Sequence, residues 1–413
     1  MKKRVVITGL GAVTPVGNDV DKFWSNIKNG VCGIDFIKSF DASNQKSKVA
    51  AEVKDFDPNL YMDKRDARRM DRYSQFAMAA STEAIKDSGL NLEEIDRERL
   101  GVLVGSGVGG IITVEKEHVK LLEKGPGRVS PFMIPMLIGN MAAGNIAIKF
   151  GAKGPCTTVV TACATGTNAI GDAYRLIEDG YADIMIAGGS EGSITPLTVA
   201  GFASLTALTK SEDPKRASIP FDKERDGFVI GEGAGIVILE SLDHAKKRGA
   251  NIYGEMKGYA MTCDAYHITS PDPKGEGAAR AMELAIKDAG ITKSDISYIN
   301  AHGTSTLYND KFETEAIKRV FGEDSYKIPV SSTKSMTGHL LGAAGAIEAI
   351  VCVKALEQGF IPPTIGYKVK DEECDLDYVP NVGRSEDITY ALSNSLGFGG
   401  HNATIILKKW DGR

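Results

Sequence analysis

Three residues in this chain have side chains and positions suited to covalent chemistry. Cys163 directly follows an apolar run at 157–161 and opens a helix of small residues, which places its sulfur at a helix N-terminus. There the helix dipole and the free backbone N–H groups lower the pKa of a thiol and can hold a developing oxyanion. His302 follows a second apolar run, and His339 opens a second helix of small residues. Each residue alone is more often structural, but a Cys-His-His set suits acyl transfer through a thioester.

The elements that must position these residues alternate between short apolar strands and helices. Strands are expected at 4–8, 100–105, 157–161 and 183–188, and a helix is expected at 73–88. Such alternation predicts βαβ units and sheets covered by helices on both faces, so the fold class is α/β. In such folds, ligands bind at the carboxyl ends of the strands, where the three residues lie.

The sequence also repeats itself after about 200 residues, which predicts a duplicated fold. The hexapeptide AIKDSG of the first half recurs as AIKDAG in the second, and each half closes with a strand-like run entered through glycines. Two Ala- and Gly-rich helices, at 162–174 and 338–353, are candidates for a crowded layer shared by both halves. We therefore expect two domains, 1–250 with the cysteine and 251–413 with the two histidines.

Four motifs occur in order along the chain: TACATG at 161–166, NAHGTST at 300–306, SSTKSMTGH at 331–339 and NSLGFGGHN at 394–402. Together they closely resemble the motifs of the condensing β-ketoacyl-acyl-carrier-protein synthases, type II in particular, and the similarity covers essentially the whole chain. The resemblance implies the thiolase-like fold, a duplicated αβαβα layered sandwich that is usually a homodimer. It also implies an elongating enzyme of type II fatty acid synthesis, which condenses malonyl-acyl-carrier protein with an acyl chain and needs no organic cofactor.

The same resemblance assigns roles to individual residues. Cys163 matches the nucleophile that accepts the acyl chain from acyl-carrier protein. His302 and His339 match the pair of hydrogen-bond donors for the enolate that forms when malonyl-carrier protein loses carbon dioxide. The backbone N–H groups of Cys163 and Phe398 match the oxyanion hole of the family.

Other motif residues have a functional and a structural interpretation. Lys334 carries a charge that favours neutral imidazoles and stabilises the enolate, and a salt bridge with Glu348 explains it equally well. Thr304 and Thr306 match residues that hydrogen-bond the pantetheine arm, although their hydroxyls could also stabilise their own turn. The side chains that match the acyl pocket and its gate, each of which core packing would also explain, are Val108, Phe132, Phe202 and Phe398.

A basic docking surface is expected because the carrier protein of this family is acidic. The candidate docking residues are Lys64, Arg65, Arg68, Arg69 and Arg128. Lys64, Arg68 and Arg72 recur at i, i+4 and i+8, which predicts that they share one stripe of a helix. Since a run of charges is usually only a solvated face, the docking role rests on the resemblance.

Composition excludes several other classes of protein. The net charge of −5 leaves no chain-wide footprint for nucleic acid or an anionic membrane, and no apolar run is long enough for a membrane span. The six cysteines lack CxxC pairs or a Cys/His cluster, which predicts a reduced, cytoplasmic protein without a metal site. A lone GxGxxG at 105–110 is not followed by an acidic strand end, so no nicotinamide cofactor is expected.

Particular residues separate the related enzymes from one another. A thiolase needs a second catalytic cysteine in the C-terminal Gly-rich loop, which 397–402 lacks, and the initiating type III synthases have Asn where His339 stands. An inactive chain-length partner would lack Cys163. Two alternatives stay open: a polyketide ketosynthase with the same chemistry on another acyl chain, and a non-catalytic interaction protein with the thiolase fold.

Overall fold

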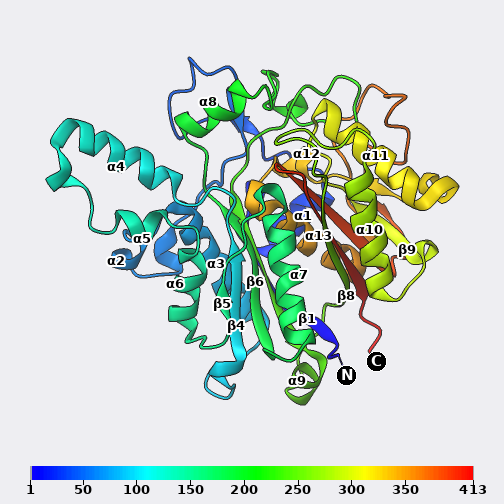
Figure 1. Ribbon diagram of the computed structural model, residues 1–413, viewed down its shortest axis with the longest axis horizontal. Coiled ribbons are helices and arrows are strands. Elements are labelled where there is room, and N and C mark those ends of the chain that lie inside the picture. The colour runs from blue at the N-terminus through cyan, green and yellow to red at the C-terminus, as the bar shows by residue number, and fades with distance from the viewer. Residues whose placement is uncertain (1, 413) are drawn as a thin grey trace.

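The computed structural model describes residues 2–412 and is built around a ten-stranded mixed sheet (Figure 1). The strand order is β10-β9-β13-β14-β8-β1-β7-β6-β4-β5. The bounds are β1 Val5–Val13, β4 Leu100–Gly105, β5 Cys156–Thr157, β6 Ile184–Glu191, β7 Gly233–Ser241, β8 Gly254–Cys263, β9 Ile296–Asn300, β10 Val330–Ser331, β13 Tyr390–Gly397 and β14 His401–Lys409. Two short pairs lie apart from this sheet: β2 (Asp35–Phe36) with β3 (Val49–Ala50), and β11 (Phe360–Ile361) with β12 (Arg384–Ser385).

The ten strands divide into two half-sheets with the same topology. One half reads β1-β7-β6-β4-β5 and the other reads β8-β14-β13-β9-β10, so matching positions hold the first, fifth, fourth, second and third strand of each half. The directions also match, because β7 and β14 are antiparallel to their neighbours and β4 and β9 are parallel to theirs. Within the described residues, the two half-sheets are joined to each other by three residue pairs between β1 and β8. This arrangement confirms the duplication inferred from the repeated hexapeptide.

Helices form the layers around the two half-sheets. α7 and α13 contact each other and strands of both halves, so they make the central layer. α3 and α6 pack on the outer face of the first half-sheet, and α10 packs on the outer face of the second, with α11 against it. The layered αβαβα fold is thereby confirmed. The bounds are α3 Arg72–Asp87, α6 Met141–Phe150, α7 Thr165–Glu178, α10 Glu276–Ala289, α11 Leu307–Phe321 and α13 Ala344–Gln358.

The remaining helices lie around this core. In Figure 1, α4 projects from the body of the molecule together with α5. The bounds are α1 Val20–Lys28, α2 Lys64–Ala67, α4 Ile111–Lys124, α5 Met133–Leu137, α8 Pro196–Ser204, α9 Leu242–Lys247 and α12 Lys334–Thr337. Within the described residues, none of these helices combines the length and the apolar composition that crossing a membrane requires.

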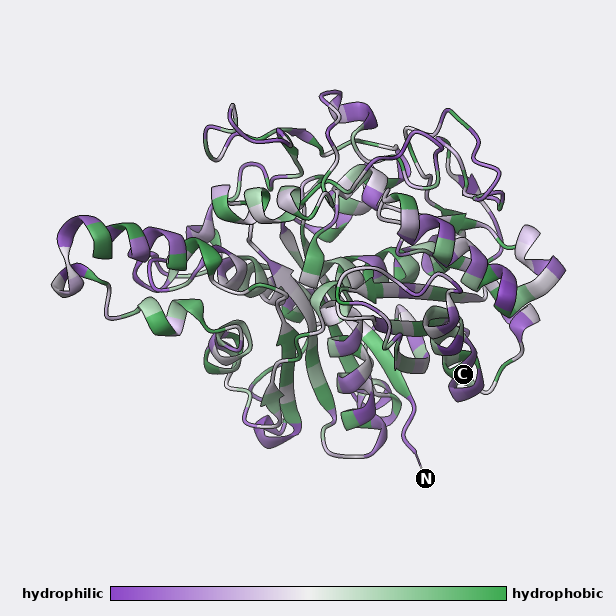
Figure 2. Ribbon diagram, turned by 45° about the horizontal axis from the view of Figure 1, so that its top comes forward, coloured by the Kyte–Doolittle hydropathy of each residue, from purple (hydrophilic) through white to green (hydrophobic). Residues whose placement is uncertain are grey.

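Hydrophobic strands and small-residue helices explain why the layers pack closely. β4, β6 and β7 are buried along their whole lengths, and Figure 2 shows apolar residues concentrated in the central strands. Strands covered on both faces are expected to be continuously apolar. In the central layer, a Cβ on Gly166 would lie 2.7 Å from the backbone nitrogen of Ala346, so only glycine permits this approach of α7 to the α13 segment.

Two local predictions are wrong. The strand expected at 157–161 ends at Thr157, because the chain leaves the sheet edge and turns inward, with the Thr158 hydroxyl bonded to the Val104 carbonyl at 2.9 Å. The single helical stripe through Lys64, Arg68 and Arg72 does not exist either. α2 ends at Ala67 and a new helix begins at Arg72, so the three side chains do not share one helix face.

Candidate active site

One cavity of about 590 Å³ brings together residues that are far apart in the sequence. Cys163, His302 and His339 all line it, and they come from the turns that follow β5, β9 and β10. Phe202, Thr304, Thr306 and Phe398 line the same cavity. The duplicated topology explains this convergence, because it directs the corresponding turns of both halves toward the central layer.

Cys163 lies in a 3-10 turn, η4 (Ala162–Ala164), directly before α7, and not at the first residue of the helix. Ala162 has a left-handed backbone with φ of 51°, a conformation that is uncommon for a residue with a side chain and persists only where the surroundings hold it. Burial raises the pKa of the Cys163 thiol to about 12, although the Lys334 charge and a hydrogen bond from the Phe398 backbone N–H act to lower it. The expected lowering of this pKa is therefore wrong for the free protein, because desolvation outweighs the favourable groups.

The two histidines form a buried pair. Their ring centroids are 5.2 Å apart with the ring planes at 87°, and each residue is only 2% exposed. Burial, followed by the Lys334 charge, lowers the pKa of both imidazoles well below 6.5, so both rings are neutral near pH 7. The Nδ1 atom of each ring is buried without a hydrogen-bond partner among residues 2–412.

Backbone contacts fix where each histidine lies. Glu313 of α11 accepts the N–H groups of His302 and Gly303, both at 2.8 Å. The backbone N–H of His339 donates to the Val229 carbonyl at 2.7 Å. Nothing in the sequence marked Glu313, because a single acidic residue in a helix has no distinctive spacing.

Lys334 forms a buried ion pair with Glu348, and the two side chains are only 2% and 3% exposed. The salt bridge considered from the sequence is thus present. The same ammonium lowers the pKa of Cys163, His302 and His339, so the ion pair does not exclude an electrostatic effect on the cavity.

Arg225 is a second residue to which the sequence gave no role. It is buried, and it donates to the Thr306 carbonyl at 3.2 Å, to the Leu307 carbonyl at 2.9 Å and to Asp371 at 2.5 Å. These bonds hold the loop that carries Thr304 and Thr306, whose hydroxyls lie 2.9 Å apart. Only the fold reveals these partners of Arg225, because they are distant from it in the sequence.

Two residues expected to line the acyl pocket lie on the surface of the chain, outside the Cys163 cavity. Val108 is 40% exposed and Phe132 is 36% exposed, and neither lines the Cys163 cavity. The Phe132 ring instead stacks under the Arg69 guanidinium at 4.4 Å. Phe202 does line the cavity, where its ring lies 6.4 Å from that of Phe398.

The basic residues expected to dock a carrier protein lie on the surface. Lys64, Arg65 and Arg68 on and after α2 are exposed, as is Arg128, and Arg69 is half-buried against Phe132. Arg72 is not part of this surface, because its guanidinium is paired with Glu232.

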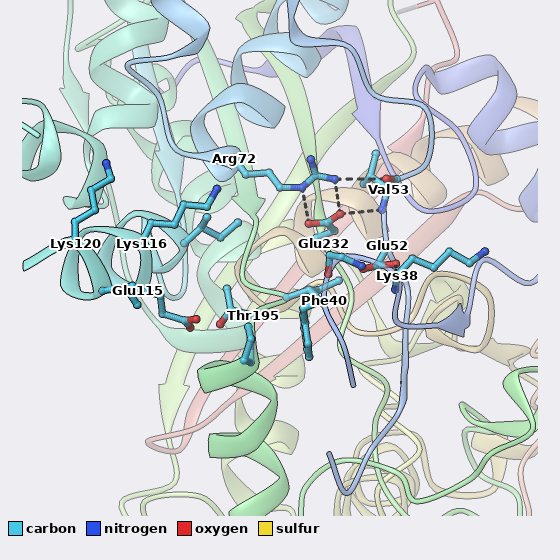
Figure 3. A pocket seen from close by; sticks show the side chains of 15 residues that line it. Lys38, Phe40, Glu52, Val53, Arg72, Glu115, Lys116, Lys120, Thr195 and Glu232 are labelled. Carbon is cyan, nitrogen blue, oxygen red and sulfur yellow. Dashed lines mark hydrogen bonds and ion pairs between the residues drawn. The ribbon is translucent and has the colours of Figure 1, made fainter. Parts of the chain in front are cut away.

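A larger cleft of about 830 Å³ lies between α4, the start of α8 and residues 38–53 (Figure 3). At its centre, the Arg72 guanidinium bonds Glu232 at 2.8 and 2.7 Å, and Glu232 also accepts the Val53 N–H at 3.0 Å. No cysteine or histidine lines this cleft. We therefore assign the chemistry to the smaller cavity. In the described chain, no three His, Cys, Asp or Glu residues are grouped so that they could hold a metal ion.

Comparison with known proteins adds an independent finding. Residues 2–245 match the model "Beta-ketoacyl synthase, N-terminal domain", and residues 253–368 match "Beta-ketoacyl synthase, C-terminal domain". A 3-oxoacyl-[acyl-carrier-protein] synthase 2 from Synechocystis is 57% identical over 410 residues, 99% of each chain. One from Staphylococcus aureus is 53% identical over 409 residues, also 99% of each chain.

Solved structures agree with the fold. A ketosynthase of a type II polyketide system, in complex with its acyl-carrier protein, has a TM-score of 0.93 at 40% identity and covers 100% of both chains. A β-ketoacyl synthase from Burkholderia phymatum has a TM-score of 0.92 at 36% identity and covers 99% of this chain and 100% of the other.

Proposed function

Because this chain belongs to the β-ketoacyl synthase family, we propose that Cys163, His302 and His339 carry out a decarboxylative condensation. The chain is a condensing acyltransferase of type II fatty acid synthesis, which joins malonyl-acyl-carrier protein to an acyl chain and forms a β-ketoacyl-acyl-carrier protein. Its identity of 57% to a fatty acid enzyme exceeds the 40% identity to the polyketide ketosynthase. The observation that carries the residue assignment is the single cavity that Cys163 shares with both histidines.

In the first half-reaction, Cys163 takes the acyl chain. Its sulfur attacks the thioester carbonyl, the bond to the carrier's thiol breaks, and that thiol leaves with the proton that Cys163 gives up. The carbonyl oxygen becomes negative in the tetrahedral intermediate. The backbone N–H groups of Cys163 and Phe398 would stabilise it, and the Phe398 N–H bond to the sulfur supports that placement.

In the second half-reaction, malonyl-carrier protein loses carbon dioxide and leaves an enolate. His302 and His339 would each donate one N–H bond to its oxygen, which the neutral state of both rings supports. The enolate carbon then attacks the acyl carbonyl, the C–S bond to Cys163 breaks, and the released sulfur regains a proton. The product is two carbons longer than the acyl chain. Thr304 and Thr306 at the cavity wall would bind the pantetheine arm.

Acyl-carrier proteins are the partners of this reaction, and we assign their docking to Lys64, Arg65, Arg68, Arg69 and Arg128. The exposure of four of these side chains supports the assignment. Arg68→Glu should raise the KM for acyl-carrier protein several-fold and leave alkylation of Cys163 by iodoacetamide unchanged. Lys287→Glu, an equal charge change at an exposed position on α10, serves as the matched control. Equal KM values for both variants would refute docking at α2.

We also propose that two copies of the chain form a homodimer. All five residues of α5 are apolar and none is buried, and Ile134 is 59% exposed. The edge strand β5 is exposed, whereas β10 at the opposite edge is buried. An exposed apolar helix and an open sheet edge each favour contact with a second copy of the chain. We further propose a division into domains 1–250 and 251–413 and a cytoplasmic location, the latter supported by the six free cysteines.

The experiment that tests the reaction follows the acyl chain. The protein is incubated with acyl-carrier proteins of several chain lengths, and adducts are located by intact mass and peptide mapping. We expect one acyl group on Cys163, absent in Cys163→Ala and released by malonyl-carrier protein as a chain two carbons longer. Cys156→Ala removes an exposed thiol instead and should leave the adduct intact. An adduct on another cysteine, or none, would overturn the mechanism.

A further inference from the structure

The second half of the fold contains a counterpart of the turn that carries Cys163. η4 (Ala162–Ala164) precedes α7 in the first half, and η8 (Leu341–Ala343) precedes α13 in the second. Both turns begin with a left-handed non-glycine residue, with φ of 51° at Ala162 and 48° at Leu341. η4 packs against β13, η8 packs against β6, and the two turns contact each other. By this correspondence, Gly342 occupies the position that Cys163 has in the first half.

The backbone N–H at this counterpart position already donates a hydrogen bond to a carboxylate. Oε2 of Glu191, the last residue of β6, accepts the N–H of Gly342 at 3.1 Å and the N–H of Gly107 at 2.9 Å. Its Oε1 accepts the Ser106 hydroxyl at 3.0 Å. The proposed reaction assigns the corresponding N–H of Cys163 to an oxyanion. In the second half, a protein carboxylate takes the place of that oxyanion.

Steric contacts leave no room for a side chain at the counterpart. A Cβ on Gly342 would clash with the Gly107 nitrogen and lie 3.0 Å from Oε2 of Glu191. A Cβ on Gly107 would lie 3.4 Å from both the Ala162 carbonyl and the Gly342 nitrogen. The turn after β4, the Cys163 turn and the Gly342 turn therefore meet at one point, and Glu191 is bonded to two of them.

We propose that Glu191 is a positioning residue that holds the Gly342 turn in its left-handed form and thereby fixes the Cys163 turn packed against it. Glu191 is fully buried, and three of its partners are donors from backbone or side chain that would otherwise lack an acceptor. A left-handed residue persists only where its surroundings over-determine it, and these bonds supply that constraint beside Leu341. The role of Glu191 in turnover rests on the proposed function of Cys163, whereas its effect on the geometry of the Cys163 turn is independent of that function.

Glu191→Ala tests this proposal by the rate at which iodoacetamide labels Cys163, followed by peptide mapping. We expect labelling and condensation to fall roughly tenfold or more as the Cys163 turn loses its constraint, the size of effect that charge-assisted hydrogen bonds have, although loss of the Glu191 charge by itself acts to lower the pKa of Cys163. Added formate should restore part of the labelling rate, because a small carboxylate can occupy the vacated site. Glu191→Gln keeps an oxygen for Gly107 and Gly342, and the Ser106 hydroxyl can turn to accept from the new amide. It loses only the 3.3 Å contact from the Val108 N–H, so this variant should label faster than Glu191→Ala.

Glu83→Ala is the matched control. Glu83 is a half-buried carboxylate that accepts two backbone N–H bonds, from Ala12 at 2.8 Å and Val20 at 2.8 Å. Burial raises its pKa to about 7, as it does for Glu191. We expect this variant to have a lower Tm but a labelling rate within twofold of the parent. If Glu83→Ala slows labelling as much as Glu191→Ala, general loosening explains the effect and the proposal is wrong.

Further outcomes separate the two proposals. Should Glu191→Ala fail to fold, Glu191→Asp replaces it, because the shorter side chain does not reach the Gly107 and Gly342 donors. An unchanged labelling rate in Glu191→Asp would overturn the positioning role. A folded Glu191→Ala variant that is labelled at the parent rate would also overturn the positioning role. If acyl-carrier protein never acylates Cys163 while iodoacetamide labelling still depends on Glu191, the proposed reaction fails and the positioning role stands.

Discussion

Replacing both members of the buried Lys334–Glu348 pair separates its structural effect from its electrostatic effect. Each side chain is almost completely shielded from water. Removing one partner of a buried pair leaves an uncompensated charge and costs about 3–5 kcal/mol, whereas replacing both with apolar residues of similar size is close to neutral. We expect Glu348→Leu alone to lower the free energy of unfolding by about 3 kcal/mol or more, and K334M/E348L to recover most of that loss.

In the double variant, the Cys163 thiol should nevertheless be a poorer nucleophile. Lys334 lowers the pKa of Cys163 and Glu348 raises it, and the effect of Lys334 is the larger. Their joint loss therefore raises this pKa further and reduces the thiolate fraction at a fixed pH. We expect alkylation of Cys163 at pH 8 to slow by about tenfold, which corresponds to roughly 1.4 kcal/mol.

Urea unfolding measures the stability of these variants, and timed iodoacetamide labelling with mass spectrometry measures the reactivity of the thiol. K354M/E357L removes another Lys–Glu pair on α13 and should leave the labelling rate unchanged. If K334M/E348L has both the stability and the labelling rate of the parent, the ion pair has no electrostatic effect on Cys163 and the reasoning is refuted.

Three further predictions concern stability, assembly and substrate binding. Because His302 and His339 have lowered pKa values when folded, the unfolded chain binds more protons below pH 6.5, so stability falls as the pH falls below that value. Urea unfolding of His302→Asn at pH 5–6.5 should show a slope smaller than the parent's, by up to about 1.4 kcal/mol per pH unit at the acidic end of this range. An unchanged slope would contradict neutral burial of this ring. Ile134→Asp should shift the protein toward the monomer in sedimentation at micromolar concentration, and equal sedimentation of variant and parent would exclude α5 from the interface. Arg225→Lys should raise the KM for pantetheine-linked substrates several-fold while kcat changes less than twofold, because lysine cannot bond the Thr306 and Leu307 carbonyls together; a fall in kcat alone would contradict a role in binding the arm.

Most regular elements could be predicted from local sequence. The strand at 100–105 has the bounds that its apolar run indicated, and each half closes with the strand expected there, β7 in the first half and β14 in the second. The helix expected at 73–88 spans Arg72–Asp87. Periodicity of side chains is a local property, so it identifies these elements without knowledge of their partners.

Predictions failed where a turn or a break interrupted an otherwise regular run. The apolar residues after Thr157 favour a strand, but the chain must leave the sheet edge there to bring Cys163 to the central layer. The spacing of Lys64, Arg68 and Arg72 fits a helix, yet α3 starts afresh at Arg72 behind Asp71. Both errors arise because the destination of the chain, and not its local composition, decides where an element ends.

The sequence by itself determined the α/β class, the duplication and the identity of the residues that could react. Each follows from order along the chain: alternation of elements, a repeated hexapeptide, and polar residues at strand ends. Only the tertiary structure decided that Cys163 is a shielded thiol with a raised pKa, that Lys334 is paired, and that Glu313 and Glu191 accept the backbone N–H groups of His302 and Gly342. The physical reason is that desolvation and hydrogen bonding depend on which distant residues meet, and packing of the two halves alone determines those contacts.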